Sequence, residues 1–537
     1  MAVAVGVVTG FGVSPLAAQL DSSTLPLLVV DLGHDAIPDE PKVLTRMRLI
    51  SDAAGRANRL SDVPTYTGAV AIERRGATSQ TVFPKTGYGF ELRTDADADT
   101  SVALLGMPAE EDWVLNGPYS DKSLLRNALA YSLAAELMPY APRTRYVDLV
   151  LDGDYRGVYL LTEKIKRDRN RVDISKLKAT DLAGDSLTGG YILKFDKGPG
   201  GSLGSDFQLP AANLAGARPS NYVYHYPRLR DIQPEQAAYI QDWFAEFERR
   251  LAGARFDDPV DGYAPLVDLE SFVDFFLVNE LAKNVDGYRL STYFYKDRDD
   301  VDGRLHMGPV WDFNLAFGNA GYCDANEVEN WMVYFQDYCP DDAYYAPFWW
   351  PRILASRIFK RALVRRYAEL RAPGGALSDD ALARRLDSLA APLTPEVVDR
   401  NFARWPVLGE YTWPNPVIVD SHAEAVDDLR QWLRDRTAWM DGAVGEFATD
   451  TLAPIPPDRD FRLSPNPGGS AVRAQGLVAR DYPLEVTWVD ARGVAVSGGQ
   501  VAGPDGWAGA LPRVSGVYVV RVRTAIGRVL RGRWVRG

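Results

Sequence analysis

Cysteine and histidine are scarce in this sequence, and basic residues do not dominate it. The 537-residue chain has 2 cysteines and 4 histidines, and its 60 Lys and Arg against 72 Asp and Glu give a net charge of −12. The histidines are scattered, at positions 34, 225, 306 and 422, so their spacing indicates neither a catalytic triad nor a metal cluster. The acidic balance gives no reason to expect nucleic acid as a partner, because nucleic-acid binding requires basic surfaces.

Long apolar runs are also absent beyond the first residues. No other stretch approaches the ~18 consecutive apolar residues of a membrane span, so we expect no transmembrane span. Residues 1–13 are apolar and small, and residues 15–19 resemble the cleavage site of a secretory signal, although the usual positively charged start is missing. Polar residues 21–23 follow directly and favour a signal peptide over residues 1–19. The alternative is a buried N-terminal strand.

The chain has two cysteines, Cys323 and Cys339, an even number in a chain for which we predict export. Exported proteins keep disulfides, so we predict one between them, which would stabilise the fold by roughly 3 kcal/mol. The alternative is two free thiols. A structural zinc site is not expected, because no histidine lies nearby in sequence and two ligands are too few.

The length predicts two or three domains. Strand patterns prevail up to about residue 200, including a hairpin over residues 146–165 with an Asp152-Gly153 turn, and helical patterns prevail from residue 233 to 445. This order predicts an α+β arrangement with a cleft between the two halves. A proline-rich linker at residues 451–458 then leads to short strands over residues 459–537, which predict a small β-sandwich.

Two aspartates frame a predicted hairpin in the second half of the chain. Asp286 lies in a polar loop, residues 291–296 and 305–310 read as strands, and Asp312 follows the second strand. Protein kinases place their catalytic base and a metal ligand in this way, on either side of a hairpin. The His-Arg-Asp loop of ordinary kinases and the Walker A motif are both missing.

Seven motifs occur in one order along the chain, at residues 104–108, 112–115, 124–127, 141–145, 157–165, 279–286 and 308–318. With them, residues 64–320 resemble the CotH (spore coat protein H) kinase family, a secreted or surface group, and the helices up to residue 445 look like its usual extension. The resemblance implies an atypical protein-kinase-like two-lobed domain over residues 20–450, with a β-rich N-lobe and a helical C-lobe. It also implies ATP with Mg²⁺ or Mn²⁺ as cofactors.

Three further motifs mark the C-terminal block, at residues 463–467, 489–493 and 515–522. With them, residues 459–537 resemble the type A sorting domain of type IX secretion. The resemblance implies the type IX secretion machinery as a partner, passage through an outer membrane, and a secreted or cell-surface location.

The family resemblance assigns roles to the two aspartates. Asp312 stands where the family has its metal-binding aspartate, and Asp286 matches the catalytic aspartate that orients the acceptor hydroxyl. Asn314 is a departure, because many relatives have a second aspartate there, and an amide keeps an oxygen ligand but loses a charge. The plainer interpretation of both aspartates is that they cap or turn the backbone.

The sequence leaves open which residue contacts the nucleotide phosphates. Lys194, Lys164 and Lys85 all lie at or near predicted strand ends, and Glu163 is a possible partner of Lys164 in an ion pair or at the metal. Arg126 either reaches phosphate or caps a carboxylate. For each lysine, a solvated surface position is the more frequent role.

Three functions are consistent with these residues. The first is a secreted atypical kinase that transfers the ATP γ-phosphoryl group to Ser or Thr of exported proteins. The second is a non-catalytic surface-binding or adhesion protein. The third, ranked last, is a carbohydrate-active enzyme that uses the paired carboxylates together with tryptophans such as Trp349, Trp350 and Trp413.

Overall fold

The structure is a computed structural model, and it describes residues 20–452, except 34, 35, 53, 199–201 and 215, and six strands between residues 462 and 536. The predicted signal peptide at residues 1–19 and residues 453–458 of the predicted linker lie outside the described residues.

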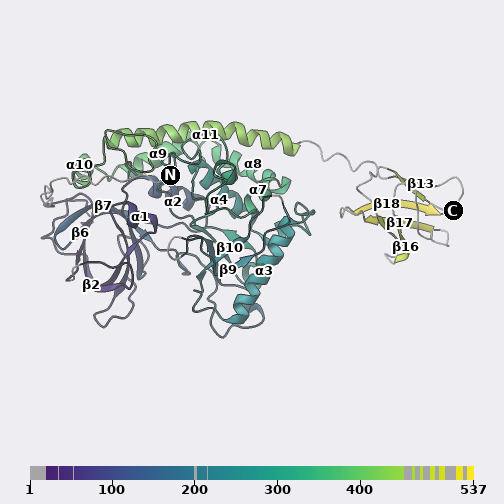
Figure 1. Ribbon diagram of the computed structural model, residues 1–537, viewed down its shortest axis with the longest axis horizontal. Coiled ribbons are helices and arrows are strands. Elements are labelled where there is room, and N and C mark those ends of the chain that lie inside the picture. The colour runs from purple at the N-terminus through teal and green to yellow at the C-terminus, as the bar shows by residue number, and fades with distance from the viewer. Residues whose placement is uncertain are drawn as a thin grey trace.

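A closed seven-stranded barrel forms the first part of the described chain (Figure 1). Its strand order is β1-β2-β3-β4-β5-β7-β6, and all of these neighbours are antiparallel. The parallel pair of β1 with β6 then closes the barrel. The predicted hairpin is confirmed, because β6 pairs with β7 and both Asp152 and Gly153 adopt positive φ in the turn. The barrel strands are β1 (Leu27–Asp31), β2 (Val43–Ile50), β3 (Tyr66–Arg75), β4 (Gly87–Arg93), β5 (Asp112–Asn116), β6 (Thr144–Leu151) and β7 (Asp154–Glu163).

A five-stranded antiparallel sheet forms the centre of the second part, in the order β12-β11-β8-β10-β9. The hairpin that the sequence predicts between the two aspartates is confirmed, because Phe294 on β11 pairs with Met307 on β12. The strands of this sheet are β8 (Tyr191–Phe195), β9 (Phe207–Leu209), β10 (Ser220–Tyr226), β11 (Thr292–Lys296) and β12 (Leu305–Met307).

Helices surround this sheet and join it to the barrel. The last one, α11, runs along one side of the main body over α8 and α9 (Figure 1), and it contacts α4, α8 and α9. Against the barrel, α10 packs on β7. The helices are α1 (Thr78–Val82), α2 (Arg126–Leu137), α3 (Pro234–Ala252), α4 (Leu269–Ala282), α5 (Asp299–Asp302), α6 (Phe335–Tyr338), α7 (Trp349–Leu354), α8 (Arg357–Arg371), α9 (Asp379–Ala390), α10 (Pro395–Arg404) and α11 (His422–Leu452).

The predicted kinase-like fold with a β-rich N-lobe and a helical C-lobe is wrong, although mixed α+β structure is present. The N-terminal strands close into a barrel, and a second sheet joins β8, β9 and β10 to the hairpin of β11 and β12 from the half that reads as helical. Local patterns reveal strands but not closure, because β1 and β6 pair across more than a hundred residues. Strands β9 and β12 have only three residues each, too few for a clear alternation.

The C-terminal strands form two antiparallel sheets, one of β13 and β14 and one in the order β16-β15-β17-β18. That they make a sorting domain stays a prediction. Among the described residues, no helix has both the length and the apolar character to cross a membrane. The strands are β13 (Arg462–Pro465), β14 (Val472–Gln475), β15 (Leu484–Val489), β16 (Ala495–Val501), β17 (Gly516–Arg523) and β18 (Val529–Arg536).

Candidate functional site

Asp312 lies in the segment after β12, and its backbone is held by α2. It has a φ of 65°, in the left-handed region that non-glycine residues rarely adopt. Its N–H donates to the Tyr131 hydroxyl at 3.1 Å, and the next N–H, that of Phe313, donates to Oδ1 of Asn127 at 2.6 Å. Within the described chain, its carboxylate has no hydrogen-bond or ion-pair partner. Strained backbone held by neighbours is typical of functional sites.

Asp286 lies in the loop that follows α4. Asn284 Oδ1 accepts its N–H at 3.2 Å, and its carboxylate accepts from Nη2 of Arg289 at 2.9 Å. Arg289 is itself fixed, because it is 2% exposed and donates to the Val285 carbonyl at 2.9 Å. One carboxylate oxygen of Asp286 is therefore tied to a rigid cation.

The end of β8 brings a third carboxylate, Asp196, to this site. Its Oδ2 accepts from Nζ of Lys194 at 2.5 Å, and its Oδ1 accepts from the Ser291 N–H at 3.4 Å. Lys194 lies on the rung of the sheet opposite Tyr293, and its ammonium is 5.6 Å from that ring. Burial lowers the pKa of Lys194, but Tyr293 and Asp196 outweigh it and the pKa is raised, so the ammonium stays charged.

The carboxylates of Asp286 and Asp196 lie near enough to Asp312 to affect its pKa. Burial, and then the negative charges of Asp286 and Asp196, raise the pKa of Asp312 to about 6, against the opposing effect of Lys197 and Arg75. Like charges held together in this way favour either a proton or a cation between them.

The barrel supplies positive charge from its β3–α1 end. Arg75, the last residue of β3, lies 5.6 Å from the Trp311 ring, next to Asp312. Lys197 Nζ donates to Oγ1 of Thr78 in α1 at 3.0 Å. The start of α1 after β3 therefore lies beside the segment that follows β8, and cations from both parts of the molecule lie near the aspartates.

The predicted disulfide is confirmed: Cys323 and Cys339 are bonded, with their Cα atoms 5.4 Å apart. Tyr322, which precedes the first cysteine, is near enough to Asp286 for that charge to help burial raise its pKa. Lys283, at the end of α4, donates to the carbonyls of Glu327 and Glu329 at 2.7 and 2.5 Å. The disulfide-closed segment thus borders the site and is fastened to the helix that precedes Asp286.

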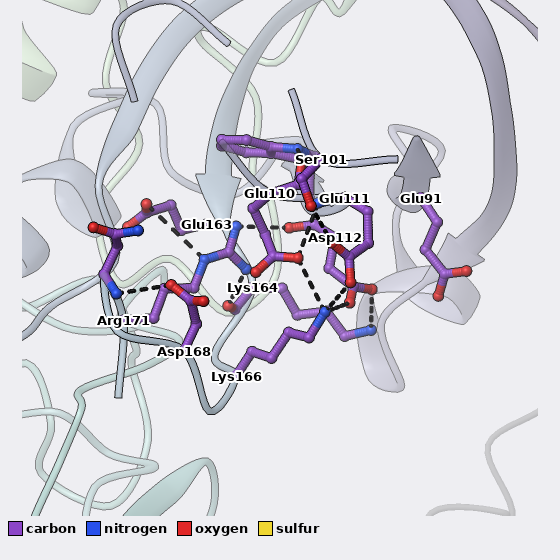
Figure 2. Close-up of polar contacts among 12 residues, drawn as sticks. Glu91, Ser101, Glu110, Glu111, Asp112, Glu163, Lys164, Lys166, Asp168 and Arg171 are labelled. Atoms are coloured by element: carbon purple, nitrogen blue, oxygen red, sulfur yellow. Dashed lines mark hydrogen bonds and ion pairs between the residues drawn. The ribbon is translucent and has the colours of Figure 1, made fainter. Parts of the chain in front are cut away.

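Two of the predicted nucleotide-binding residues belong to a separate ion-pair network at the end of the barrel (Figure 2). Lys164 Nζ donates to Asp112 at 2.9 Å, and the buried Glu163 accepts from Arg143 Nη1 at 2.8 Å. Lys166 bridges the carboxylates of Glu110, Glu111 and Asp112. This acidic group already holds an ammonium where a metal ion would sit.

The remaining predicted residues, Arg126, Asn314 and Lys85, make the following contacts. Arg126 is buried at the start of α2, where it pairs with Asp121 at 2.7 Å and donates to the Ala316 carbonyl at 3.1 Å. It therefore positions the segment after Asp312. Asn314 is partly exposed, and its carbonyl accepts from Asn319 at 2.8 Å. Lys85 is 1% exposed and donates to Asn401 at 2.9 Å.

Sequence reasoning missed four residues of the site: Asp196, Lys197, Arg75 and Arg289. The Lys-Phe-Asp sequence at the end of β8 and the Gly-Ala-Thr-Ser sequence after Arg75 are visible signals, yet neither is specific without the tertiary neighbours. An arginine three residues after Asp286 is equally ordinary.

The donor set suits a hard cation, because Asp196, Asp286, Asp312 and Asn314 offer only oxygen atoms. The three aspartates do not belong to the groups of His, Cys, Asp and Glu side chains whose ligand atoms lie within 4.8 Å of one another in the described chain. Those groups are Glu110–Asp112, and Asp268 with Asp302 and His306. Mg²⁺ usually keeps several waters and few direct carboxylate ligands, so spaced carboxylates fit its chemistry.

A family model described as CotH kinase protein matches residues 72–440, which is more than half of the chain. The match contains all the aspartates of the site and ends before residues 459–537, so the sorting domain stays a prediction. No curated protein matches the chain.

Proposed function

Because the chain belongs to the CotH kinase protein family, we propose that it is an atypical metal-dependent kinase that transfers the ATP γ-phosphoryl group to Ser or Thr of exported proteins. The observation that carries this proposal is the convergence of Asp196, Asp286 and Asp312 with the cations of Lys194, Lys197 and Arg75. Phosphoryl transfer needs carboxylates for a metal ion, positive charge for the phosphates and a group that orients the acceptor hydroxyl.

Each residue has a role that follows from its contacts. Asp312, whose carboxylate has no partner in the described chain, and Asn314 would hold Mg²⁺ or Mn²⁺, with Asp196 beside them. When bound, the cation neutralises charge on the transferred phosphoryl group. Asp286 is held by Arg289 and accepts the proton of the acceptor hydroxyl through its remaining carboxylate oxygen.

Lys194 and Lys197 are the better candidates for contact with the phosphates. Lys194 lies within the site, whereas Lys164 is engaged with Asp112 at the barrel end and Lys85 with Asn401. A lysine beside a carboxylate is kept charged and oriented, as a phosphate contact requires.

Export is part of the proposal. The signal-like residues 1–19 and the sorting-domain-like residues 459–537 support passage by the type IX secretion machinery to a secreted or cell-surface location. The disulfide is compatible with an extracellular environment, because disulfides persist where conditions are oxidising.

Thermal unfolding of the full chain with and without ATP, in Mg²⁺ or Mn²⁺, tests the nucleotide site. ATP at 100-fold over its Kd stabilises the native state by about 2.7 kcal/mol. We expect a metal-dependent rise in Tm that Asp312→Ala abolishes. Asp300→Ala is the matched control, because Asp300 is exposed and has no partner in the described chain.

If no nucleotide and no metal shifts the Tm, the kinase proposal fails, and a surface-binding protein becomes the better explanation. If Asp312→Ala unfolds without ligand at a much lower Tm than the native chain, Asp312→Asn replaces it, because the amide keeps the shape of the carboxylate and removes its charge.

A further inference from the structure

A second basic region lies away from the aspartates, in a pocket of about 790 Å³. The residues after β7, the segment at 176–179, the end of β10 and the start of α3 line it. It thus opens where the barrel, the second sheet and a helix meet.

The lining of this pocket is strongly cationic. Seven lysine and arginine side chains line it against two aspartates, although the whole chain has a net charge of −12. Lys164 pairs with Asp112, and Lys166 pairs with Glu110, Glu111 and Asp112. In the part of the chain that the structure describes, Arg167, Lys176, Lys178 and Arg228 have no carboxylate within 4.0 Å. These four cations are therefore available to pair with a negatively charged ligand.

The rest of the lining suits a peptide better than a small free anion. Leu177, Tyr226 and Pro227 add apolar surface between the cations, and Arg167 lies 6.0 Å from the Tyr226 ring. The start of α3 borders the pocket through Gln233 and Gln236, and helix N-termini favour negative charge. A volume of about 790 Å³ holds several side chains, far more than one phosphate needs.

The wall of the pocket contacts the candidate site through two side-chain rings. His225 lines the pocket, and its ring meets that of Tyr293 edge-on at 5.1 Å. On the same ring lies the ammonium of Lys194, which pairs with Asp196. The pocket therefore lies beside the candidate site, with the rings of His225 and Tyr293 between it and Lys194.

We propose that this pocket binds an acidic peptide segment of the protein acceptor, with its carboxylates on Arg167, Lys176, Lys178 and Arg228. That the segment belongs to an acceptor rests on the proposed kinase function, whereas the binding of an acidic peptide does not. The pocket then selects exported proteins whose Ser or Thr lies near a run of Asp or Glu.

The test uses the full chain and a short fluorescein-labelled oligo-glutamate peptide with a central serine, followed by fluorescence anisotropy without nucleotide. Simultaneous Lys176→Glu, Lys178→Glu and Arg228→Glu substitutions reverse three exposed charges of the pocket. The matched control reverses three other exposed arginines that lack ion pairs in the described chain, by Arg59→Glu, Arg361→Glu and Arg384→Glu.

We expect the pocket variant to bind the peptide at least about tenfold more weakly than the control variant, and added salt to weaken binding to the native chain. The Asp312→Asn variant should bind the peptide with the same affinity as the native chain. Loss of peptide binding and loss of the nucleotide site can therefore be distinguished.

Equal affinity in the pocket and control variants overturns the proposal. So does equal affinity of the native chain for an oligo-lysine peptide. Tighter binding of a single-stranded oligonucleotide than of the peptide, lost in the same pocket variant, overturns it as well and assigns the pocket to nucleic acid.

Discussion

At the scale of single residues, Lys85 is an ionisable group removed from water. It is 1% exposed, its ammonium donates to Asn401 at 2.9 Å, and it lies 5.2 Å from the Tyr159 ring. Burial lowers its pKa to about 7, although the charges of Asp148 and Asp121 oppose the shift. Removal from water disfavours the ammonium more than these distant carboxylates favour it.

This pKa predicts a rise in stability with pH. Between pH 7 and the ordinary lysine pKa near 10.4, the unfolded chain binds more protons at Lys85 than the folded chain, so the free energy of unfolding increases by at most about 1.4 kcal/mol per pH unit. We expect urea unfolding at pH 7 and pH 9 to show a gain about 2 kcal/mol larger in the native chain than in Lys85→Met.

The comparison of the native chain with Lys85→Met cancels the effect of pH on all other titrating groups, because both proteins contain those groups. Parallel pH profiles of the two proteins would show that the ammonium stays charged in the fold. The Val158 N–H keeps Asn401 Oδ1 occupied in the variant, at 3.0 Å.

At the scale of elements, the contact of β7 with α10 depends on a glycine. Gly157 has a φ of 95°, and a Cβ atom there would lie 2.7 Å from Oδ1 of Asn401 and 2.9 Å from Nε1 of Trp405. Trp405 Nε1 also donates to the Arg156 carbonyl at 2.8 Å. The strand therefore approaches the helix so closely that no side chain fits between them.

Gly157→Ala should be strongly destabilising, by about 3 kcal/mol, because it adds a steric clash to the cost of a positive φ. Gly153→Ala is the matched control, since Gly153 has a φ of 80° and no atom within 4 Å of its added Cβ. Gly153→Ala should lower the free energy of unfolding by about 1 kcal/mol, because it adds only the strain of a positive φ. Chemical denaturation of both variants checks this, and equal costs would contradict a close contact between β7 and α10.

At the scale of the whole molecule, α11 ties distant segments together through one buried ion pair. Arg436 and Glu280 are both fully buried and lie 3.2 Å apart. Arg436 also donates to the carbonyls of Glu280 and Asn330, and Glu280 accepts the N–H groups of Met332 and Val333. The pair thus joins α11, α4 and the disulfide-closed segment beside the site.

Arg436→Met should cost roughly 3–5 kcal/mol of unfolding free energy, because it leaves the Glu280 charge buried without its cation. Arg430→Met in the same helix is the matched control: its partner Asp387 is exposed, so its loss should cost less than about 1 kcal/mol. Denaturant unfolding compares the two. Similar small losses in both variants would mean that Glu280 is neutral in the fold.

The sequence by itself determined the features that depend on local order. The alternation of residues 291–296 and 305–310 predicted the hairpin between Asp286 and Asp312, and the Asp152-Gly153 turn predicted β6 and β7. The cysteine pair predicted the disulfide. Each of these signals lies within a short stretch, where side-chain period, turn chemistry and residue count carry the information.

Only the tertiary structure decided how these stretches meet. The parallel pair of β1 with β6 closes the barrel and overturns the two-lobed prediction. Long-range packing also placed Asp196 near Asp312 and paired Lys164 with Asp112, outside the candidate site. It also brought together the lysines and arginines that line the basic pocket. The physical reason is that each of these outcomes depends on contacts between residues far apart in the chain, whose free energy no local pattern contains.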